Sequence, residues 1–280
     1  MSAQMIRRAR PLLGTVVEIR LHGVAPRAAD RALDAAFDEI ASVQECMSFH
    51  AAASDVARLN AAPAGVWLDV DPRTAEVLAL MRAVASRSAG AFDVCVAPRA
   101  VDAGLLPAPS ARAPDAAADW RDIELGAGAR VRLARPLWLD LGGIAKGYGV
   151  DRAIAALLAH GVPRACVNAG GDLRAYGAAE TVYLRAADGS VAGALELADA
   201  AVATSSSGAT PTHWRGTRGH AVAPGRSASV VAPQCALADA LTKVALALTP
   251  TAAQDVLAAF GAQAALHDAA HGWQALARAA

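Results

Sequence analysis

The segment from Ala236 to Leu248 constrains the fold of this chain more than any other. It reads as a helix that is apolar on every side except at Asp239, Thr242 and Lys243. A helix that is apolar all round is normally buried, so other elements must cover it. The 280 residues, of which 55% are hydrophobic, suffice for such a core. We therefore expect residues 1–280 to form a single domain, or two closely packed lobes with a loop near 107–119.

The three polar residues of this helix lie on one of its faces, because positions i, i+3 and i+4 are neighbours on a helix surface. Burying an unpaired carboxylate is costly, so Asp239 needs a partner. That partner is Lys243, a metal ion, or both. An ordinary Asp–Lys pair at a solvent-exposed edge is the alternative, and the apolar neighbours of the pair argue against it.

The remaining chain mixes strand and helix patterns without strict alternation, which favours an α+β (mixed α/β) fold over a doubly wound sheet. The predicted strands are Thr15–His22, Val66–Val70, Phe92–Ala97, Ile123–Leu125, Val131–Leu133, Leu137–Leu139, Val182–Arg185, Ala194–Leu197 and Ser227–Ala232, with two more near the C-terminus. The predicted helices are Pro26–Met47, one starting at Pro72, Ala145–His160, Ala236–Leu248 and Thr251–Phe260. Thr204–Gly219 is predicted to be a mobile loop.

Charge and cysteine content argue against several classes of function. Basic and acidic side chains both number 26, so no positive surplus indicates nucleic-acid binding. The four cysteines form no CxxC pair, which argues against a cysteine metal cluster. No apolar run reaches the length of a membrane span or a signal peptide. We therefore expect no membrane insertion and a cytoplasmic protein.

The glycine-rich segment Asp140–Asp151 is the clearest candidate for a ligand site. Four glycines lie between a predicted strand and a predicted helix, where backbone N–H groups and the helix dipole can hold an anion. The spacing matches neither GxxxxGK[ST] nor GxGxxG, so a tight turn alone would explain most such segments. Lys146 favours phosphate binding, because Lys146 and Lys243 are the only lysines among the 26 basic side chains.

Together, these segments resemble the FAD:protein FMN transferase (ApbE-type) family. The matching elements are Leu13-Gly-Thr15, Met47–Asn60, Gly90–Asp93, Asp140–Asp151, Asn168–Asp172, Thr204-Ser205 and Ala238–Leu241, in the family's order along nearly the whole chain. The resemblance implies an ApbE-like fold of two lobes with the flavin bound between them. It also implies an enzyme that cleaves FAD and attaches FMN through a phosphoester to a Thr or Ser hydroxyl of a partner protein, with release of AMP.

The resemblance also assigns residues. It implies a Mg²⁺ ion held by the Ala145 carbonyl and Asp239, with Thr242 as a further ligand. His220 is the expected general base, because a histidine suits proton transfer near neutral pH. Lys146 and Lys243 are expected to neutralise the phosphates. The residues expected to bind FAD are Leu13, His50, Ala91, Phe92, Asp93, Gly142, Gly143, Lys146 and Tyr148.

Three positions depart from the family pattern. Lys243 stands where a threonine is usual, so either Thr242 serves as the metal ligand or the Lys243 ammonium replaces one cation and weakens metal dependence. The segment His220–Pro224 lacks the aspartate of the family's His-x-x-Asp-Pro element. His50 replaces a tyrosine expected to pack on the flavin or the adenine.

Two other functions stay open at this stage. One is FAD diphosphate hydrolysis, with water in place of the protein hydroxyl. The other is a flavin-binding protein that only stores or delivers FAD. Only protein modification requires a docking surface, for which Thr204–Gly219 is the expected site.

Overall fold

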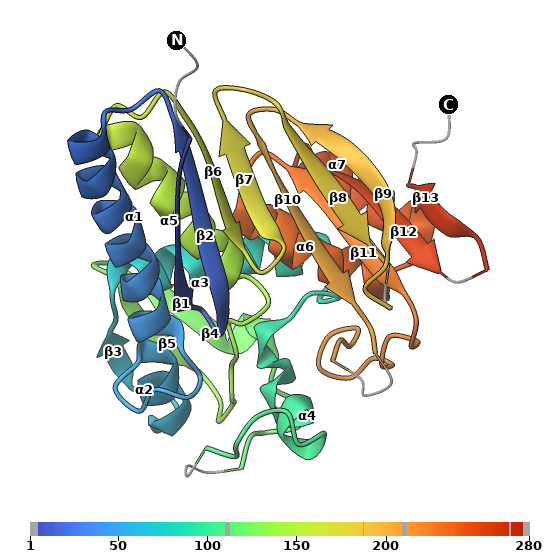
Figure 1. Ribbon diagram of the computed structural model, residues 1–280. Coiled ribbons are helices and arrows are strands. Elements are labelled where there is room, and N and C mark those ends of the chain that lie inside the picture. The colour runs from blue at the N-terminus through green and yellow to red at the C-terminus, as the bar shows by residue number, and fades with distance from the viewer. Residues whose placement is uncertain (1–4, 110–112, 187, 209–211, 269, 277–280) are drawn as a thin grey trace.

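An antiparallel sheet of eight strands forms the centre of the molecule (Figure 1). The structure is a computed structural model that describes residues 5–109, 113–186, 188–208, 212–268 and 270–276. Across the sheet the strands follow the order β1-β2-β6-β7-β10-β11-β12-β13. Their bounds are β1 (Ile6–Leu12), β2 (Thr15–His22), β6 (Arg164–Ala169), β7 (Asp172–Tyr176), β10 (Ala200–Ser206), β11 (Ser227–Ala232), β12 (Gln263–Asp268) and β13 (Gly272–Ala275).

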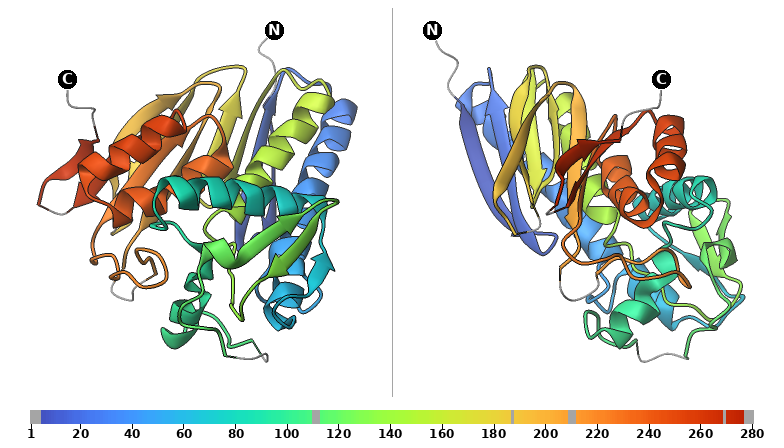
Figure 2. Two further views of the ribbon diagram at one scale, coloured as in Figure 1. Left: turned by 180° about the vertical axis from the view of Figure 1, so that it is seen from behind. Right: turned by 90° about the vertical axis from the view of Figure 1, so that its right-hand side faces the viewer.

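Four helices cover one face of this sheet (Figure 2). They are α1 (Pro26–Met47), α5 (Ala145–Ala159), α6 (Cys235–Ala247) and α7 (Pro250–Ala259). Val17, Ile19 and Leu21 of β2 turn to this side and are fully buried. Alternation along the strand therefore places one row of side chains in the core, as the sequence predicts.

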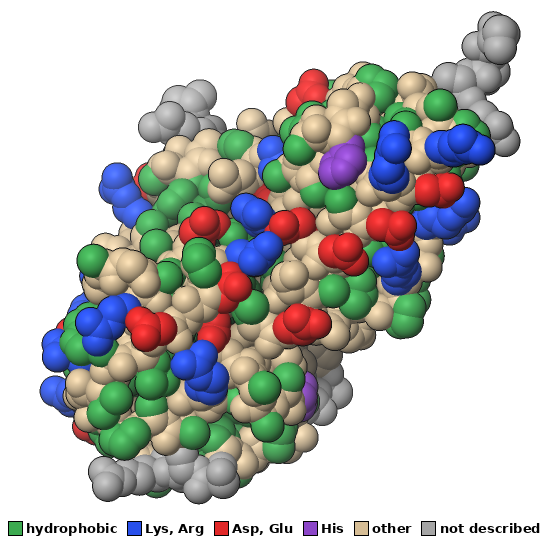
Figure 3. Space-filling model, turned by 90° about the vertical axis from the view of Figure 1, so that its left-hand side faces the viewer, with side chains coloured by type: hydrophobic (Ala, Val, Ile, Leu, Met, Phe, Trp, Pro, Cys, Tyr) green, Lys and Arg blue, Asp and Glu red, His purple; other side chains and the backbone are tan. Residues whose placement is uncertain are grey.

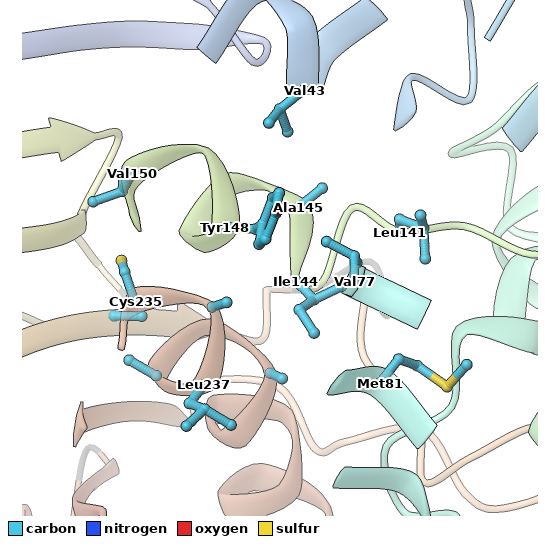
Figure 4. Close-up of a cluster of buried hydrophobic side chains, with 14 of the residues drawn as sticks. Val43, Val77, Met81, Leu141, Ile144, Ala145, Tyr148, Val150, Cys235 and Leu237 are labelled. Atoms are coloured by element: carbon cyan, nitrogen blue, oxygen red, sulfur yellow. The ribbon is translucent and has the colours of Figure 1, made fainter. Parts of the chain in front are cut away.

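The helix α6 lies in the core, as its apolar sequence requires. All of its residues except Lys243 and Ala247 are buried. The sheet lies on one side of it, and α5 and α7 pack beside it. Figure 4 shows the cluster in which α5 packs between α1 and α6, with Val43, Tyr148 and Leu237 among its members.

A hairpin covers part of the other face of the sheet. It consists of β8 (Glu180–Arg185) and β9 (Val191–Leu197), paired antiparallel, as the sequence predicts. Leu197 joins Cys166, Leu173 and Val202 in a second, smaller core. The sheet is therefore buried on both faces at its centre.

The smaller elements gather at one end of the molecule. A three-stranded antiparallel sheet has the order β3-β5-β4, and α3 lies beside it (Figures 1 and 2). The bounds are α2 (Asp55–Ala61), β3 (Trp67–Asp69), α3 (Pro72–Arg87), the 3-10 helix η1 (Val94–Val96), α4 (Ala97–Asp102), η2 (Trp120–Asp122), β4 (Ile123–Gly126) and β5 (Arg130–Leu133).

The predicted α+β class is confirmed, and three local predictions are wrong. Phe92–Ala97 is not a strand but a turn followed by η1 and the start of α4. Leu137–Leu139 runs extended without joining a sheet. The first residues of the predicted loop Thr204–Gly219 belong to β10, and residues 209–211 of that loop lie outside the described part of the chain.

Charges of both signs are interleaved on the face seen in Figure 3. On the side of α1, Glu39 accepts hydrogen bonds from Arg73 at 3.1 Å and from Arg152 at 2.9 Å. These bonds tie α1 to α3 and α5. Within the described residues, no helix combines the length and the apolar character needed to cross a bilayer.

Candidate functional site

The glycine-rich turn leads into the first turn of α5, which is buried except for the partly exposed Lys146. Asp140 Oδ1 accepts a hydrogen bond from Gly142 N at 3.0 Å, which closes the turn. The N-cap residue Ile144 makes no side-chain hydrogen bond to the helix. In this first turn Ala145 N donates to Leu141 O at 2.8 Å and Gly147 N to Asp239 Oδ2 at 3.3 Å, which leaves Lys146 N to donate to an anion.

Gly147 lets α5 approach α6 closely. A Cβ atom at this position would lie 2.3 Å from the carbonyl oxygen of Cys235, far closer than two such atoms can approach. The close crossing brings Asp239 of α6 to the first turn of α5, where its Oδ2 accepts from Gly147 N at 3.3 Å. The packing of the two helices thus places a buried carboxylate directly behind the glycine-rich turn.

Two lysine–aspartate pairs stand side by side at this crossing. Lys243 binds Asp239, and Lys146 binds Asp172, which is the first residue of β7. The Asp239 and Asp172 side chains are 1% and 3% exposed, so both carboxylates are fixed inside the protein. Of the partners that the sequence leaves open for Asp239, the structure shows Lys243.

The charges within this group set each other's protonation. The carboxylate of Asp239 raises the pKa of Lys146, and Asp172 adds to the effect against the opposing influence of burial. Burial raises the pKa of Asp239, but the charges of Lys243 and Lys146 outweigh it and leave that pKa below its usual value. Burial also raises the pKa of Asp172. Lys146 is therefore an ammonium group at neutral pH.

Two cavities meet at the glycine-rich turn. The first, of about 320 Å³, is bordered by Phe92, Leu105 and Trp214. The second, of about 430 Å³, is bordered by Leu13, Met47 and Phe49. Both are lined by Leu106, Asp140, Gly142 and Lys146, so the glycine-rich turn lies between two largely apolar hollows.

The turn between β1 and β2 holds a strained residue at the second cavity. Leu13 has a φ of 55°, in the left-handed region that a branched side chain rarely adopts. Its N–H donates to Gln44 Oε1 of α1 at 2.6 Å, which helps to hold this conformation. Non-glycine residues in this region persist where surrounding contacts fix them, often at ligand sites.

Most of the residues expected to bind FAD line the two cavities. Ala91, Phe92, Asp93, Gly142, Gly143 and Lys146 border the first, and Leu13, His50, Gly142 and Lys146 border the second. Asp93 is held by Cys95 N and Trp120 N, and burial raises its pKa to about 6. Tyr148 is not among the lining residues. It is buried, and its hydroxyl donates to Glu76.

The expected catalytic residues do not all meet. Lys146 and Lys243 border the first cavity. His220 is exposed and borders a neighbouring hollow, together with Trp120 and Arg218. Asp239 and Thr242 lie beneath the cavity floor and are 1% and 0% exposed.

His213 borders the first cavity, and the sequence analysis did not identify it. It lies across a short hairpin from His220: Val222 N donates to the His213 carbonyl at 2.9 Å, and Arg215 N to the His220 carbonyl at 3.0 Å. Burial lowers the pKa of His213 to about 4, and Lys243 contributes to this, while a hydrogen bond to the Ser206 backbone opposes it. The imidazole is therefore neutral at physiological pH. No local motif marks His213, and only the hairpin pairing reveals its position.

The donors expected to hold a metal ion are already in use. Asp239 Oδ1 accepts from Lys243 Nζ and Oδ2 from Gly147 N. The Thr242 hydroxyl donates to the Asp239 carbonyl at 2.6 Å and shares a hydrogen bond of 2.7 Å with Ser205. Within the described residues, no group of three or more His, Cys, Asp or Glu side chains is arranged to bind a metal.

Comparison with known proteins gives a consistent result. The profile of the ApbE family matches residues 13–266. A protein of Treponema pallidum (strain Nichols) named FAD:protein FMN transferase is 29% identical over 185 residues, covering 61% of this chain and 51% of that protein. A protein of the same name from Rhodobacter capsulatus is 33% identical, covering 59% and 34%. The match thus spans about half the length of these curated relatives, or less.

Solved structures share the fold. The apo flavinyl transferase ApbE of Pseudomonas stutzeri superposes with a TM-score of 0.83 at 21% identity, covering 98% of this chain and 96% of that one. The ApbE protein of Thermotoga maritima gives 0.78 at 23% identity, with 97% of each chain covered. At these identities the likeness shows a common fold.

Proposed function

The chain belongs to the ApbE family, and we propose that it acts as an FAD:protein FMN transferase. It would bind FAD, cleave the diphosphate, and attach FMN to a Thr or Ser hydroxyl of an acceptor protein. The observation that carries this proposal is the pair of apolar cavities that share Gly142 and Lys146. FAD has two ring systems joined through a diphosphate, and this arrangement offers a hollow for each ring system with an anion site between them.

The transfer needs an acceptor oxygen, a leaving group and a base. The hydroxyl oxygen attacks the phosphorus on the FMN side, a P–O bond forms, and the P–O bond to the AMP phosphate breaks. AMP leaves with the electron pair of that bond, and the hydroxyl proton passes to a base. Lys146 and the first turn of α5 stabilise the charge that builds on the phosphate oxygens.

We assign the base to His213 and not to His220. His213 borders the cavity that contains Gly143, Lys146 and Lys243, and it is neutral at physiological pH. A hydrogen bond that raises the pKa of a histidine is one that the ring donates, so bonding to Ser206 leaves the other ring nitrogen free to accept a proton. His220 has no such position, since it borders the neighbouring hollow.

The magnesium ion expected from the family resemblance does not fit the donors of this site. Its expected ligands Asp239 and Thr242 are buried and bonded to Lys243, Gly147 and Ser205. Ala145, the third expected ligand, opens α5 at the edge of the second cavity. We therefore derive no step through a metal. The docking role of Thr204–Gly219 and a cytoplasmic location stay predictions, and the Mg²⁺ dependence that the family resemblance implies is untested.

The proposed function is tested by incubating the purified protein with FAD and a peptide containing an Asp-Gly-x-Thr-Gly sequence. We expect AMP release together with a peptide whose mass increases by one FMN. Lys146→Ala should abolish both signals, whereas Arg82→Ala, on an exposed position of α3, should leave them unchanged.

Other outcomes would assign another function. AMP and FMN without labelled peptide, for several acceptor sequences, would indicate an FAD hydrolase. FAD that binds and stays intact would indicate a storage or delivery protein, and absence of FAD binding would exclude all three functions.

A further inference from the structure

The ammonium group of Lys243 occupies the position next to Asp239 in which a cation is expected. Lys243 Nζ binds Asp239 Oδ1 and also donates to the Asp239 backbone carbonyl at 3.0 Å. An ammonium has three N–H bonds, and these two acceptors use two of them. Because Lys243 also borders the first cavity, the third N–H is available to a ligand oxygen there.

The surroundings fix this lysine in place. Its side chain is 14% exposed and leans against the glycine-rich turn, where a Cβ at Gly143 would lie 3.4 Å from Lys243 Cε. The other face of Asp239 is closed by Gly147 N. A divalent ion at Asp239 would have to displace the Lys243 ammonium and remain beside it, against their mutual repulsion.

Each of the two buried aspartates of the site has a lysine of its own. Lys243 offsets Asp239, and Lys146 offsets Asp172. Each pair places its ammonium at the cavity and its carboxylate beneath, and the Asp140 carboxylate borders the same cavity. A diphosphate therefore meets two fixed cations.

We propose that Lys243 replaces the divalent cation at Asp239, so that this chain binds and cleaves its diphosphate ligand with two lysine ammonium groups and without Mg²⁺. The inference rests on the proposed function for the identity of the ligand. Its central statement, that Asp239 binds no Mg²⁺ while Lys243 is present, is independent of that function.

The test compares wild type with Lys243→Thr, which removes the ammonium and supplies a hydroxyl that can bind a metal. Mg²⁺ binding is measured by calorimetry with and without FAD, and FAD affinity by flavin fluorescence in excess EDTA or millimolar Mg²⁺. For wild type we expect no Mg²⁺ binding and the same FAD affinity in both buffers. For Lys243→Thr we expect FAD affinity in EDTA to fall about tenfold, the usual effect of losing one charge-assisted hydrogen bond, and Mg²⁺ to restore it.

A second variant distinguishes the loss of the charge from misfolding of the protein. Lys243→Gln keeps an N–H donor for Asp239 but carries no charge, so it should melt as cooperatively as wild type. Its FAD affinity in EDTA should nevertheless fall about tenfold, because the lost interaction with the diphosphate depends on charge.

Two results would overturn the proposal. One is stoichiometric Mg²⁺ binding by wild type that Asp239→Asn removes. The other is loss of wild-type FAD affinity in EDTA. If no variant binds FAD, the proposed function fails. The Mg²⁺ titration of wild type then still decides whether Lys243 excludes the ion.

Discussion

At the scale of single residues, the rarity of a residue type and the apolar character of its surroundings identified more of the candidate site than local motifs did. Lys146 and Lys243 could be singled out because the chain has almost no other lysine, and Asp239 because its helix is otherwise apolar. His213 could not be found in this way. Its place depends on the pairing of two short segments, Trp214 with Ala221, that no local pattern predicts.

Replacing each of the two histidines of this hairpin in turn tests which one accepts the proton. His213→Gln should lower the rate of FMN transfer by a factor of about 100 or more, the usual contribution of a general base, while FAD affinity stays nearly constant. His220→Gln should retain wild-type rates, since His220 borders the neighbouring hollow. Both rates are measured by AMP release at saturating FAD.

The pH profile gives a second readout of the same assignment. A base works only when it is unprotonated, and the pKa of His213 is lowered to about 4. Wild-type activity should therefore persist below pH 6 and decline only toward pH 4. A decline centred near the ordinary histidine pKa of about 6.5 would instead point to an exposed histidine such as His220.

At the scale of elements, long periodic segments were predictable and short ones were not. The bounds predicted for α1, α5, α6 and α7 agree with the structure within one residue. Leu137–Leu139 has the alternation of a strand, but the Asn60 side chain satisfies its backbone: Asn60 Oδ1 accepts from Leu139 N at 2.8 Å and Asn60 Nδ2 donates to Leu139 O at 3.0 Å. In Phe92–Ala97, Asp93 accepts from Cys95 N and starts η1. Such side-chain hydrogen bonds compete with sheet formation, and the hydrophobic periodicity of the sequence does not reveal them.

The crossing of α5 and α6 should be intolerant of one added methyl group. Gly147→Ala improves helix propensity by about 1 kcal/mol, yet its Cβ would meet the Cys235 carbonyl, and such overpacking costs about 1–3 kcal/mol or more. We expect a lower melting temperature and weaker FAD binding, because Asp239 and Lys243 move with α6. Thermal unfolding followed by circular dichroism measures the first effect.

Gly149→Ala is the matched control for this substitution. It gives the same gain in helix propensity, and its Cβ would meet no backbone atom: the end of the Leu13 side chain lies at 3.1 Å, with Val43 and Ile40 in ordinary contact at 3.8 and 3.9 Å. Its melting temperature should stay near that of wild type. An equal loss in both variants would show that the close crossing at Gly147 is not the cause.

At the scale of the whole molecule, the site joins segments that are far apart in sequence. The hairpin turn at Leu13, the end of α1, the residues around Phe92, the glycine-rich turn and α6 all border the two cavities. The fold class and the ligand-binding turn were predictable from the sequence. The division into two hollows was not, because it depends on how the region from Phe92 to Leu106 packs against the helices.

Because the hollows share the anion site, FAD should stabilise the protein more than its halves do. At equal concentrations, FAD should raise the melting temperature by more than FMN and AMP supplied together, since a linked ligand gains from effective concentration. FAD at about 100 times its Kd stabilises the folded protein by about 2.7 kcal/mol, which for a chain of this size should raise the melting temperature by roughly 5 °C. Equal shifts for FAD and for FMN alone would mean that only one hollow is occupied.

The two paired lysines also determine how this protein reacts with amine-directed reagents. Lys146 and Lys243 carry every ε-amino group of the chain, and both are ion-paired with buried aspartates. An ammonium is not a nucleophile, so acylating reagents and lysine cross-linkers find little to modify on the folded protein. Cross-linking of an acceptor protein to this chain therefore has to proceed through carboxylates or arginines. Acylation of Lys146 or Lys243, where it occurs, would show that the ion pair of that lysine with its aspartate has opened.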